Sequence, residues 1–281
     1  MSQVAVITDP LAMSAWAEET RRSGQRIAFV PTMGALHGGH QALLAEGRRR
    51  ADKLVLSIFV NPLQFGPQED LAKYPRDLPG DLAKAAREGC DLAFVPEPAS
   101  MYAPGFQTFV DVRDVSQGLC GERRPGHFLG VATVVCKLFN LVRPHVAIFG
   151  EKDFQQLMVL RRMVIDLNMP VEMVGLPTVR EPDGLAMSSR NAYLSPADRQ
   201  RAVALISGLR TAKALAEKGE RRVSALLSAA RERMTPCVDR LDYLEVRAAD
   251  DLKPLETLDR PAVMLVAAFV GGTRLIDNMR L

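Results

Sequence analysis

The sequence lacks the features that would point to a secreted, membrane-spanning or zinc-binding protein. Among its 281 residues, none of Cys90, Cys120, Cys136 and Cys237 forms a Cys-x-x-Cys pair, so neither a zinc knuckle nor a redox dithiol is predicted. The longest apolar run, 262–270, has nine residues, whereas a membrane helix needs about 20. Charged residues also interrupt the start of the chain, which is not typical of a signal peptide. We therefore expect a cytoplasmic protein with reduced thiols.

A strong excess of one charge is also missing. Lysine and arginine total 36 against 33 acidic residues, which leaves a net charge of +3, and no long basic block occurs. This balance does not favour nucleic acid or a membrane surface as a partner. The remaining composition, 47% hydrophobic and 25% charged, is that of an ordinary globular protein. The length suggests roughly two domains.

Apolar runs and helical patterns alternate through the first part of the sequence. Asp9 and Pro10 are typical of a helix start, and 81–88 and 157–167 carry helical periodicity. Strands that alternate with helices predict a doubly wound parallel sheet. The runs expected to form strands buried on both faces are 26–30, 54–60, 91–95 and 145–149.

The alternation stops near residue 177. Two long helical segments are followed by three strand-like runs, which predicts a smaller α+β domain with an antiparallel sheet. The helical segments are 196–218 and 221–234, and the strands 241–247, 262–270 and 273–277. The predicted domains are 1–178 and 179–281.

The segment 31–40 follows the first of these buried strands and contains His37, His40 and three glycines. Glycine lets the backbone approach a ligand closely, and the helix N-terminus that follows offers free N–H groups. Phosphate is the expected ligand, with the imidazoles donating hydrogen bonds to its oxygens. A plain glycine-rich turn with surface histidines fits the composition equally well. No P-loop or G-x-G-x-x-G motif occurs, and the other two histidines lack partners at zinc-ligand spacing.

Amide side chains follow the second strand. Asn61 and Gln64 are suited to hold the hydroxyl and carboxylate groups of a small substrate. An Asn-Pro turn with a solvated glutamine is the alternative. The polar segment 66–73 is either a lid or a plain surface loop.

The segment 150–156 opens a helix after the fourth strand. Lys152 opposes the helix dipole there, so we expect it to face a phosphate. Asp153 is expected to cap the helix and Gln156 to face a substrate. Glu151 and Gln155 are expected to face solvent.

A further cationic segment, 187–191, lies just past the domain boundary. Ser188, Ser189 and Arg190 form a set suited to grip phosphate, and the loop could close over a ligand held by the first domain. The basic segment 122–127 either faces an anionic substrate or forms an exposed loop.

In combination, these segments resemble the pantothenate synthetase (pantoate–β-alanine ligase) family. The resemblance implies a Rossmann-like fold of the nucleotidyltransferase type that carries a HIGH signature, with MSSR in place of the KMSKS loop. The matching motifs are PTMGALHGGH at 31–40, FVNPLQFG at 59–66, YPR at 74–76, RPGHFLGVATVV at 124–135, GEKDFQQL at 150–157 and DGLAMSSRN at 183–191.

The resemblance also implies a two-step reaction. Pantoate and ATP with Mg²⁺ form pantoyl adenylate and diphosphate, and β-alanine then displaces AMP to give pantothenate. The family is typically a cytoplasmic homodimer paired through its N-terminal domain. A related enzyme that transfers a nucleotidyl group to a phosphorylated acceptor, or a nucleotide-binding module without turnover, are the alternatives.

Residue roles follow from the same resemblance. His37, His40, Lys152 and Arg190 are implied in catalysis, and Asn61, Gln64 and Gln156 in substrate binding. Asp81 is the implied Mg²⁺ residue, although Gly80 stands where the family often has a second acid. The implied ATP site consists of Met33, Gly34, Ala35, Leu36, His37, Gly38, Gly39, His40, Gly150, Glu151, Lys152, Asp153, Val179, Met187, Ser188, Ser189 and Arg190.

Overall fold

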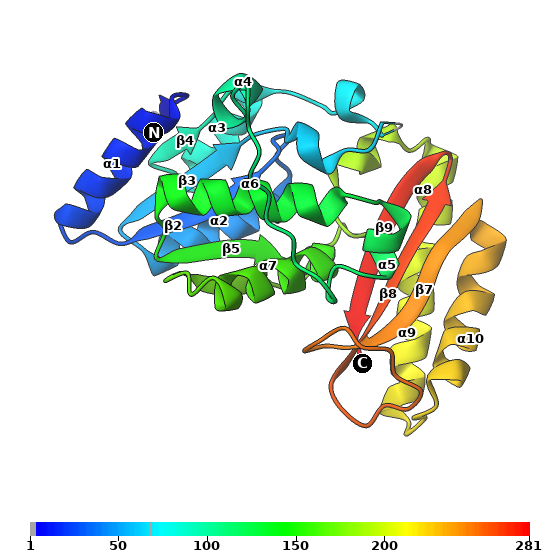
Figure 1. Ribbon diagram of the computed structural model, residues 1–281. Helices are drawn as coiled ribbons and strands as arrows, with labels where there is room; N and C mark the ends of the chain where they lie inside the picture. The colour runs from blue at the N-terminus through cyan, green and yellow to red at the C-terminus, as the bar shows by residue number, and fades with distance from the viewer. Residues whose placement is uncertain (1–3, 68) are drawn as a thin grey trace.

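The computed structural model describes residues 4–67 and 69–281, and within them the chain forms two sheets (Figure 1). The larger sheet has six parallel strands in the order β1-β4-β3-β2-β5-β6, and the smaller has three antiparallel strands, β7-β8-β9. The strands are β1 Ala5–Ile7, β2 Ile27–Thr32, β3 Lys53–Ile58, β4 Leu92–Phe94, β5 Val146–Gly150, β6 Glu172–Leu176, β7 Arg240–Ala248, β8 Ala262–Val270 and β9 Thr273–Arg280.

Helices connect the strands. The α-helices are α1 Pro10–Arg22, α2 Gly38–Arg50, α3 Leu78–Arg87, α4 Pro98–Met101, α5 Leu119–Arg123, α6 His127–Val142, α7 Phe154–Asp166, α8 Pro196–Ala202, α9 Ala204–Glu217 and α10 Val223–Met234. Short 3₁₀ turns are η1 Pro62–Gln64, η2 Leu71–Lys73, η3 Glu151–Asp153, η4 Ser189–Tyr193 and η5 Thr235–Cys237. No helix in this part of the chain is long and apolar enough to cross a membrane.

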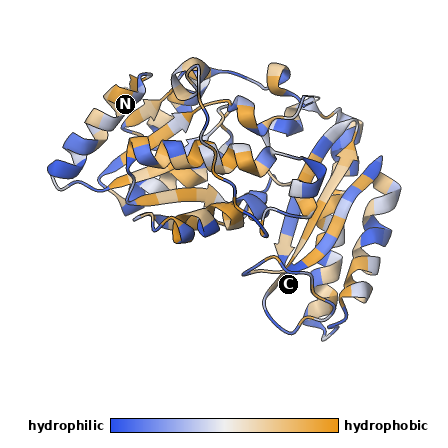
Figure 2. Ribbon diagram, in the orientation of Figure 1, coloured by the Kyte–Doolittle hydropathy of each residue, from blue (hydrophilic) through white to orange (hydrophobic). Residues whose placement is uncertain are grey.

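Both faces of the larger sheet are covered by helices. Side chains alternate across a strand, so Ile27 and Phe29 of β2 pack with α1, α6 and α7, whereas Ala28 and Val30 pack with α2 and α3. The buried parts of the inner strands are accordingly mostly apolar (Figure 2). The predicted doubly wound parallel sheet is confirmed.

The smaller sheet is also buried on two faces. One face packs on α9 and α10 through residues such as Val266. On the other, Val263 and Leu265 of β8 contact Phe154 and Met158 of α7. This double burial explains why β8 is a continuous apolar run, although antiparallel strands more often alternate. The predicted antiparallel sheet is confirmed.

Several predicted boundaries are wrong. β1 and β6 lie at the two edges of the larger sheet and are partly exposed, so neither produced a long apolar run. The helix expected over 196–218 divides at Val203 into α8 and α9. The helix expected to begin at Asp81 begins three residues earlier, because Asp77 caps α3 by accepting the N–H of Gly80.

Candidate active site

A cavity of about 220 Å³ lies at the carboxyl ends of β2 and β5. These strands are neighbours, and the sheet continues from them in opposite directions, through β3 on one side and β6 on the other. Such a switch point is where open α/β sheets bind ligands. The implied site residues that line the cavity are Met33, His37, Gly39, His40, Asn61, Gln64, Gly150, Lys152, Asp153, Gln156, Val179, Met187, Ser188, Ser189 and Arg190. Gly34, Ala35, Leu36, Gly38, Asp81 and Glu151 are not among the residues that line it.

A buried carboxylate holds the glycine loop, which we define as residues 31–40. The side chain of Asp81 is 1% exposed and accepts the backbone N–H groups of Ala35 at 2.8 Å and Leu36 at 2.7 Å. Gly34 has a φ of +86°, and a Cβ atom there would lie 3.1 Å from the carboxylate, so this position requires glycine. The loop is therefore tied to α3, a helix more than forty residues further along the chain.

The described residues do not fit a metal ion held by the protein alone. In the ranges 4–67 and 69–281, no group of three or more His, Cys, Asp or Glu side chains is arranged to hold one. Both oxygens of Asp81 already accept backbone hydrogen bonds, and the residue lies outside the cavity lining. These two hydrogen bonds show that Asp81 holds the glycine loop. The implied role of Asp81 in Mg²⁺ binding stays a prediction, and this geometry does not support it.

The two histidines of the glycine loop are oriented by backbone donors. Nδ1 of His37 accepts the N–H of Gly39 at 3.1 Å, and Nδ1 of His40 accepts the N–H of His37 at 3.3 Å. A ring nitrogen that accepts a hydrogen bond carries no proton, so the neutral rings carry theirs on Nε2. A Cβ atom on Gly39 would lie 2.8 Å from the His37 ring, which is why glycine stands there.

Both rings are neutral at pH 7. Burial, followed by the charge of Lys152, lowers the pKa of His37 to about 4, and burial, followed by His37 and Lys152, lowers the pKa of His40 to about 3. The ring centroids are 4.1 Å apart. In this state each imidazole has a donor at Nε2, and Lys152 lines the same cavity. The alternative of exposed surface histidines is wrong, because both rings line the cavity.

The C-terminal sheet fixes the segment that carries Lys152. Nδ2 of Asn278, on β9, donates to the carbonyl oxygens of Glu151 at 2.8 Å and Lys152 at 2.9 Å. Motif spacing gave no sign of this contact, because Asn278 lies 126 residues from Lys152 in the chain. The position of Lys152 thus depends on both sheets.

Three expectations for the same segment are wrong. The side chain of Asp153 makes no capping hydrogen bond. Glu151 forms an ion pair with Arg280 at 2.8 Å instead of facing solvent. Gln155 is 4% exposed, accepts the N–H of Cys120 at 3.0 Å and donates to the carbonyl oxygens of Val115 and Gln117, so it holds the start of α5 and the loop before it. Glu151 and Gln155 thus interact with residues that are distant from them in the sequence.

The amides after β3 are ordered, which rules out the alternative of a solvated glutamine. Asn61 is 1% exposed, accepts the hydroxyl of Tyr102 at 2.7 Å, and donates to Oε1 of Gln64 at 3.1 Å. Nε2 of Gln64 lies 3.1 Å from Sδ of Met33. Gln156 lines the same cavity from α7. Asn61 therefore orients Gln64, and both glutamines can present amide groups to a ligand.

The basic segment 122–127 is not an exposed loop at Arg124. Its guanidinium pairs with Glu69 at 2.6 Å and donates to the carbonyl oxygen of Gln64 at 3.2 Å. His127 reaches the same oxygen through Nδ1 at 2.9 Å, and its Nε2 accepts from Arg124 at 2.9 Å. Burial, followed by the charge of Arg124, lowers the pKa of His127 to about 4. The segment thus supports the backbone of Gln64.

Two segments that border the cavity contact each other, and we call them the latch: residues 69–74 and 188–193. Arg190 pairs with Asp70 at 3.0 Å, the hydroxyls of Tyr74 and Ser189 lie 3.3 Å apart, and Tyr193 donates to the carbonyl oxygen of Lys73 at 3.2 Å. Burial would raise the pKa of Asp70, but the hydrogen bond and charge of Arg190 outweigh it and hold that pKa below its usual value. Sequence reasoning missed Asp70 and Tyr74 as partners of the 188–193 loop.

Comparisons with known proteins agree along almost the whole chain. A family model described as pantoate-beta-alanine ligase matches residues 5–280. The pantothenate synthetase of Myxococcus xanthus is 56% identical over 280 residues, which cover 99% of this chain and 96% of that protein. The one from Syntrophotalea carbinolica is 54% identical over 274 residues, with 97% of each chain covered.

Solved structures are similar as well. The crystal structure of pantothenate synthetase from Thermus thermophilus has a TM-score of 0.93 at 46% identity and covers 98% of this chain and 99% of that one. A pantoate-beta-alanine ligase from Francisella tularensis, complexed with beta-gamma ATP and beta-alanine, has a TM-score of 0.83 at 30% identity and covers 98% and 97%.

Proposed function

The chain belongs to the pantoate–β-alanine ligase family, and we propose that the cavity at the ends of β2 and β5 is where its reaction takes place. The protein is an ATP-dependent ligase that condenses pantoate with β-alanine to form pantothenate. One observation carries the assignment of the site: His40 and Lys152 line the same cavity as Gln64 and Gln156. Groups suited to phosphate and groups suited to a hydroxy acid thus face a common space.

In the first step we propose, a carboxylate oxygen of pantoate attacks the α-phosphorus of ATP. The new oxygen–phosphorus bond forms as the bond to diphosphate breaks, which yields pantoyl adenylate. Negative charge develops on the phosphate oxygens, and donors aimed at that charge lower the barrier. Nε2–H of His37 and His40, the ammonium of Lys152 and the guanidinium of Arg190 are the proposed donors.

In the second step, the amine of β-alanine attacks the acyl carbon of the adenylate. The carbon–nitrogen bond forms, AMP leaves with the electrons of the broken carbon–oxygen bond, and the amine loses a proton. Gln64 and Gln156 would hold the pantoyl group throughout, with Asn61 orienting Gln64. Met33, Val179 and Met187 would line the nucleoside part of the site, with the backbones of the glycine loop and of 150–153 around the phosphates.

Magnesium would reach this site as part of the substrate. Mg²⁺ often keeps several waters and binds mainly through substrate phosphates, which suits a cavity whose charged groups are mostly cationic. A homodimer paired through the first domain is a further proposal that rests on the family resemblance. The proposed cytoplasmic location rests on that resemblance and on the composition. The proposed domains, 1–178 and 179–281, rest on the change of sequence pattern near residue 177, the second being a lid that carries the 187–191 loop.

The assignment is tested by leaving out one component at a time. With pantoate, β-alanine and MgATP present, we expect pantothenate and AMP, and no product when any one is omitted. Pantoate alone should support exchange of labelled diphosphate into ATP, because the first step is reversible. Exchange without pantoate, or product without exchange, would contradict the two-step route.

The pantoate side is tested by Gln64→Ala and Gln156→Ala. Each removes an amide from the cavity, so we expect the KM for pantoate to rise about tenfold or more, with a smaller change in the KM for ATP. Steady-state kinetics with each substrate varied in turn measures this. Unchanged constants for pantoate in both variants would remove the two glutamines from the site.

A further inference from the structure

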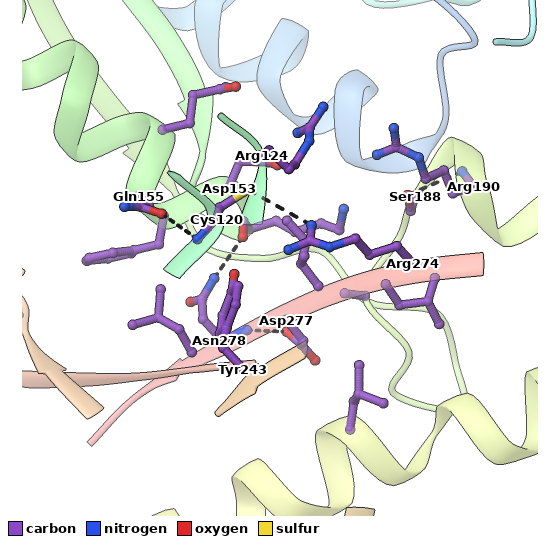
Figure 3. Close-up of a pocket in the computed structure, with 18 of the residues that line it drawn as sticks. Cys120, Arg124, Asp153, Gln155, Ser188, Arg190, Tyr243, Arg274, Asp277 and Asn278 are labelled. Atoms are coloured by element: carbon purple, nitrogen blue, oxygen red, sulfur yellow. Dashed lines mark hydrogen bonds between the residues drawn. The ribbon is translucent and has the colours of Figure 1, made fainter. Parts of the chain in front are cut away.

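A second, smaller cavity shares part of its lining with the first. Figure 3 shows residues that line this second cavity. Its volume is about 60 Å³, room for several water molecules or for one small charged group. Five residues line both cavities and so form the boundary between the two: Lys152, Asp153, Gln156, Ser188 and Arg190. The far side is built from Cys120 on α5 and from β9.

The charges around this side cavity are mostly positive. Arg124, Lys152, Arg190 and Arg274 line it, together with Asp153 and Asp277. Both carboxylate oxygens of Asp277 accept hydrogen bonds from Arg180, at 2.7 and 2.9 Å, which neutralises that charge. Three of the arginines are paired in the same way, with Glu69, Asp70 and Asp242. The space therefore suits an anion through the donor groups that these pairs leave unused.

Arg274 has donor groups that its protein partners do not use. Its Nε donates to Oδ2 of Asp242 at 2.9 Å, and its Nη1 lies 3.9 Å from Sγ of Cys120. The guanidinium also lies over the ring of Tyr243, 5.8 Å from the centroid. Its Nη2 is buried and has no hydrogen-bond partner among the described residues. A buried donor of this kind calls for an explanation, and an arginine edge is well suited to an oxyanion.

We propose that the side cavity is an oxyanion subsite of the ligase and that Arg274 is its recognising side chain. The proposal rests on the placement of ATP and pantoate in the main cavity. Two groups of the reaction have the required chemistry, since β-alanine carries a carboxylate and diphosphate carries phosphoryl oxygens. Either would have to pass the boundary residues that the two cavities share in order to reach Arg274.

Three variants test the subsite. Arg274→Gln removes the charge, and Arg274→Lys keeps a cation but loses the planar edge of donors. Arg240→Gln is the matched control, because Arg240 lies 3.8 Å from the same Asp242 carboxylate but is 64% exposed at its side chain and lines neither cavity. Effects that come only from disturbing Asp242 should appear in the control as well.

The readouts separate the two oxyanions. If the carboxylate of β-alanine occupies the subsite, Arg274→Gln raises the KM for β-alanine about tenfold or more. The preference for β-alanine over its neutral amide then falls by a similar factor, and pantoate-dependent diphosphate exchange is unchanged. If diphosphate occupies it, the concentration of diphosphate that half-saturates exchange rises about tenfold, and the KM for β-alanine is unchanged.

The proposal is overturned if the Arg274→Gln protein folds and changes none of these constants more than the Arg240→Gln control does. Arg274→Lys, which can keep the contact with Asp242, should shift the same constant by a smaller factor. If neither variant folds, the wild-type enzyme decides: equal use of β-alanine and its amide, together with no inhibition by diphosphate, would reject the subsite. A wild-type enzyme without pantoate-dependent exchange would instead contradict the proposed function.

Discussion

The glycine loop and the latch border the same cavity but are held in place by different kinds of interaction. The glycine loop is fixed by backbone hydrogen bonds to a carboxylate that is 1% exposed. The latch depends on side-chain contacts between segments from distant parts of the chain, and its Arg190 and Asp70 side chains remain 31% and 25% exposed. Partly exposed ion pairs contribute about 1 kcal/mol or less and are weakened by salt.

The two kinds of interaction suit two different tasks, one for the glycine loop and one for the latch. Donors that stabilise developing charge work best when they need no reorganisation during the reaction, and the glycine loop offers its histidines in a fixed orientation. We propose that the latch is released to admit substrates, and its weaker contacts suit a release at low cost. Loss of a glycine-loop contact should therefore reduce turnover or stability strongly, whereas loss of a latch contact should have a small effect.

His40→Ala should give the largest effect. It removes a donor that is proposed to strengthen its hydrogen bond in the transition state, so kcat should fall about 100-fold or more while the KM for ATP changes little. Steady-state kinetics measures both constants. His40→Asn, which retains an acceptor and a donor on a shorter side chain, should recover part of the loss, and His37→Ala shows which ring matters more. A large rise in the KM for ATP with little loss of kcat would refute the role.

Asp81→Asn tests what holds the glycine loop. An amide nitrogen cannot accept a backbone N–H, so one of the two hydrogen bonds is lost and the free energy of unfolding should fall by about 1–3 kcal/mol. Urea denaturation measures the change. Asp77→Asn on the same helix is the control, because asparagine caps a helix as well as aspartate does. A changed Mg²⁺ requirement with unaltered stability would instead favour the metal-binding role of Asp81.

Acid should act on the two regions in different pH ranges. His37 and His127 have a pKa of about 4 and His40 of about 3 in the folded protein, against about 6.5 when unfolded. The unfolded chain therefore binds more protons as the pH falls from about 6.5 to about 4 for His37 and His127, and to about 3 for His40. Stability is lost over these ranges, by up to about 2 kcal/mol for each ring at pH 5.

The carboxylates of the latch lose their contribution to stability at a lower pH than the histidines do. For Asp70 and Glu69, burial would raise the pKa, but Arg190 and Arg124 hold it below the usual values of 3.8 and 4.5. Their contribution is present above those values and is lost only as the pH falls below them. Denaturation between pH 7 and 3 measures the loss of stability in both ranges, and NMR of the imidazole Cε1–H signals measures the pKa of each histidine. Titration of His37 or His40 near pH 6.5 would contradict the buried, neutral state.

Asp70→Asn should give the smallest effect. It releases Arg190 from a competing carboxylate, so stability should fall by about 1 kcal/mol or less, and the KM for ATP should fall slightly because the guanidinium becomes free for phosphate. Salt should reduce the difference from wild type. Asp166→Asn, which breaks an exposed pair with Arg162 on α7, is the control. A strong rise in the KM for ATP would mean that the closed latch is required for binding.

The sequence was most informative where chemistry is concentrated in short segments. The glycines and histidines of 31–40, the amides at 61 and 64 and the lysine at 152 were identified from residue type and from their position after strands, and they meet at one cavity. The roles assigned to them remain predictions. Reasoning failed for Asp153, Glu151 and Gln155, because a helix start alone does not reveal that Arg280 and the N–H of Cys120 take two of these side chains as partners.

By itself, the sequence determined the two classes of sheet, the buried strands and the motifs of the site, because apolar periodicity and turn residues act over a few neighbouring positions. Only the tertiary structure decided which residues hold those motifs in place. Asp81 reaches back to the glycine loop, Asn278 fixes the backbone of Lys152 from the last strand, and Asp70 meets Arg190 across 120 positions of chain. Such partners depend on the packing of whole sheets and helices against each other, which no local pattern records.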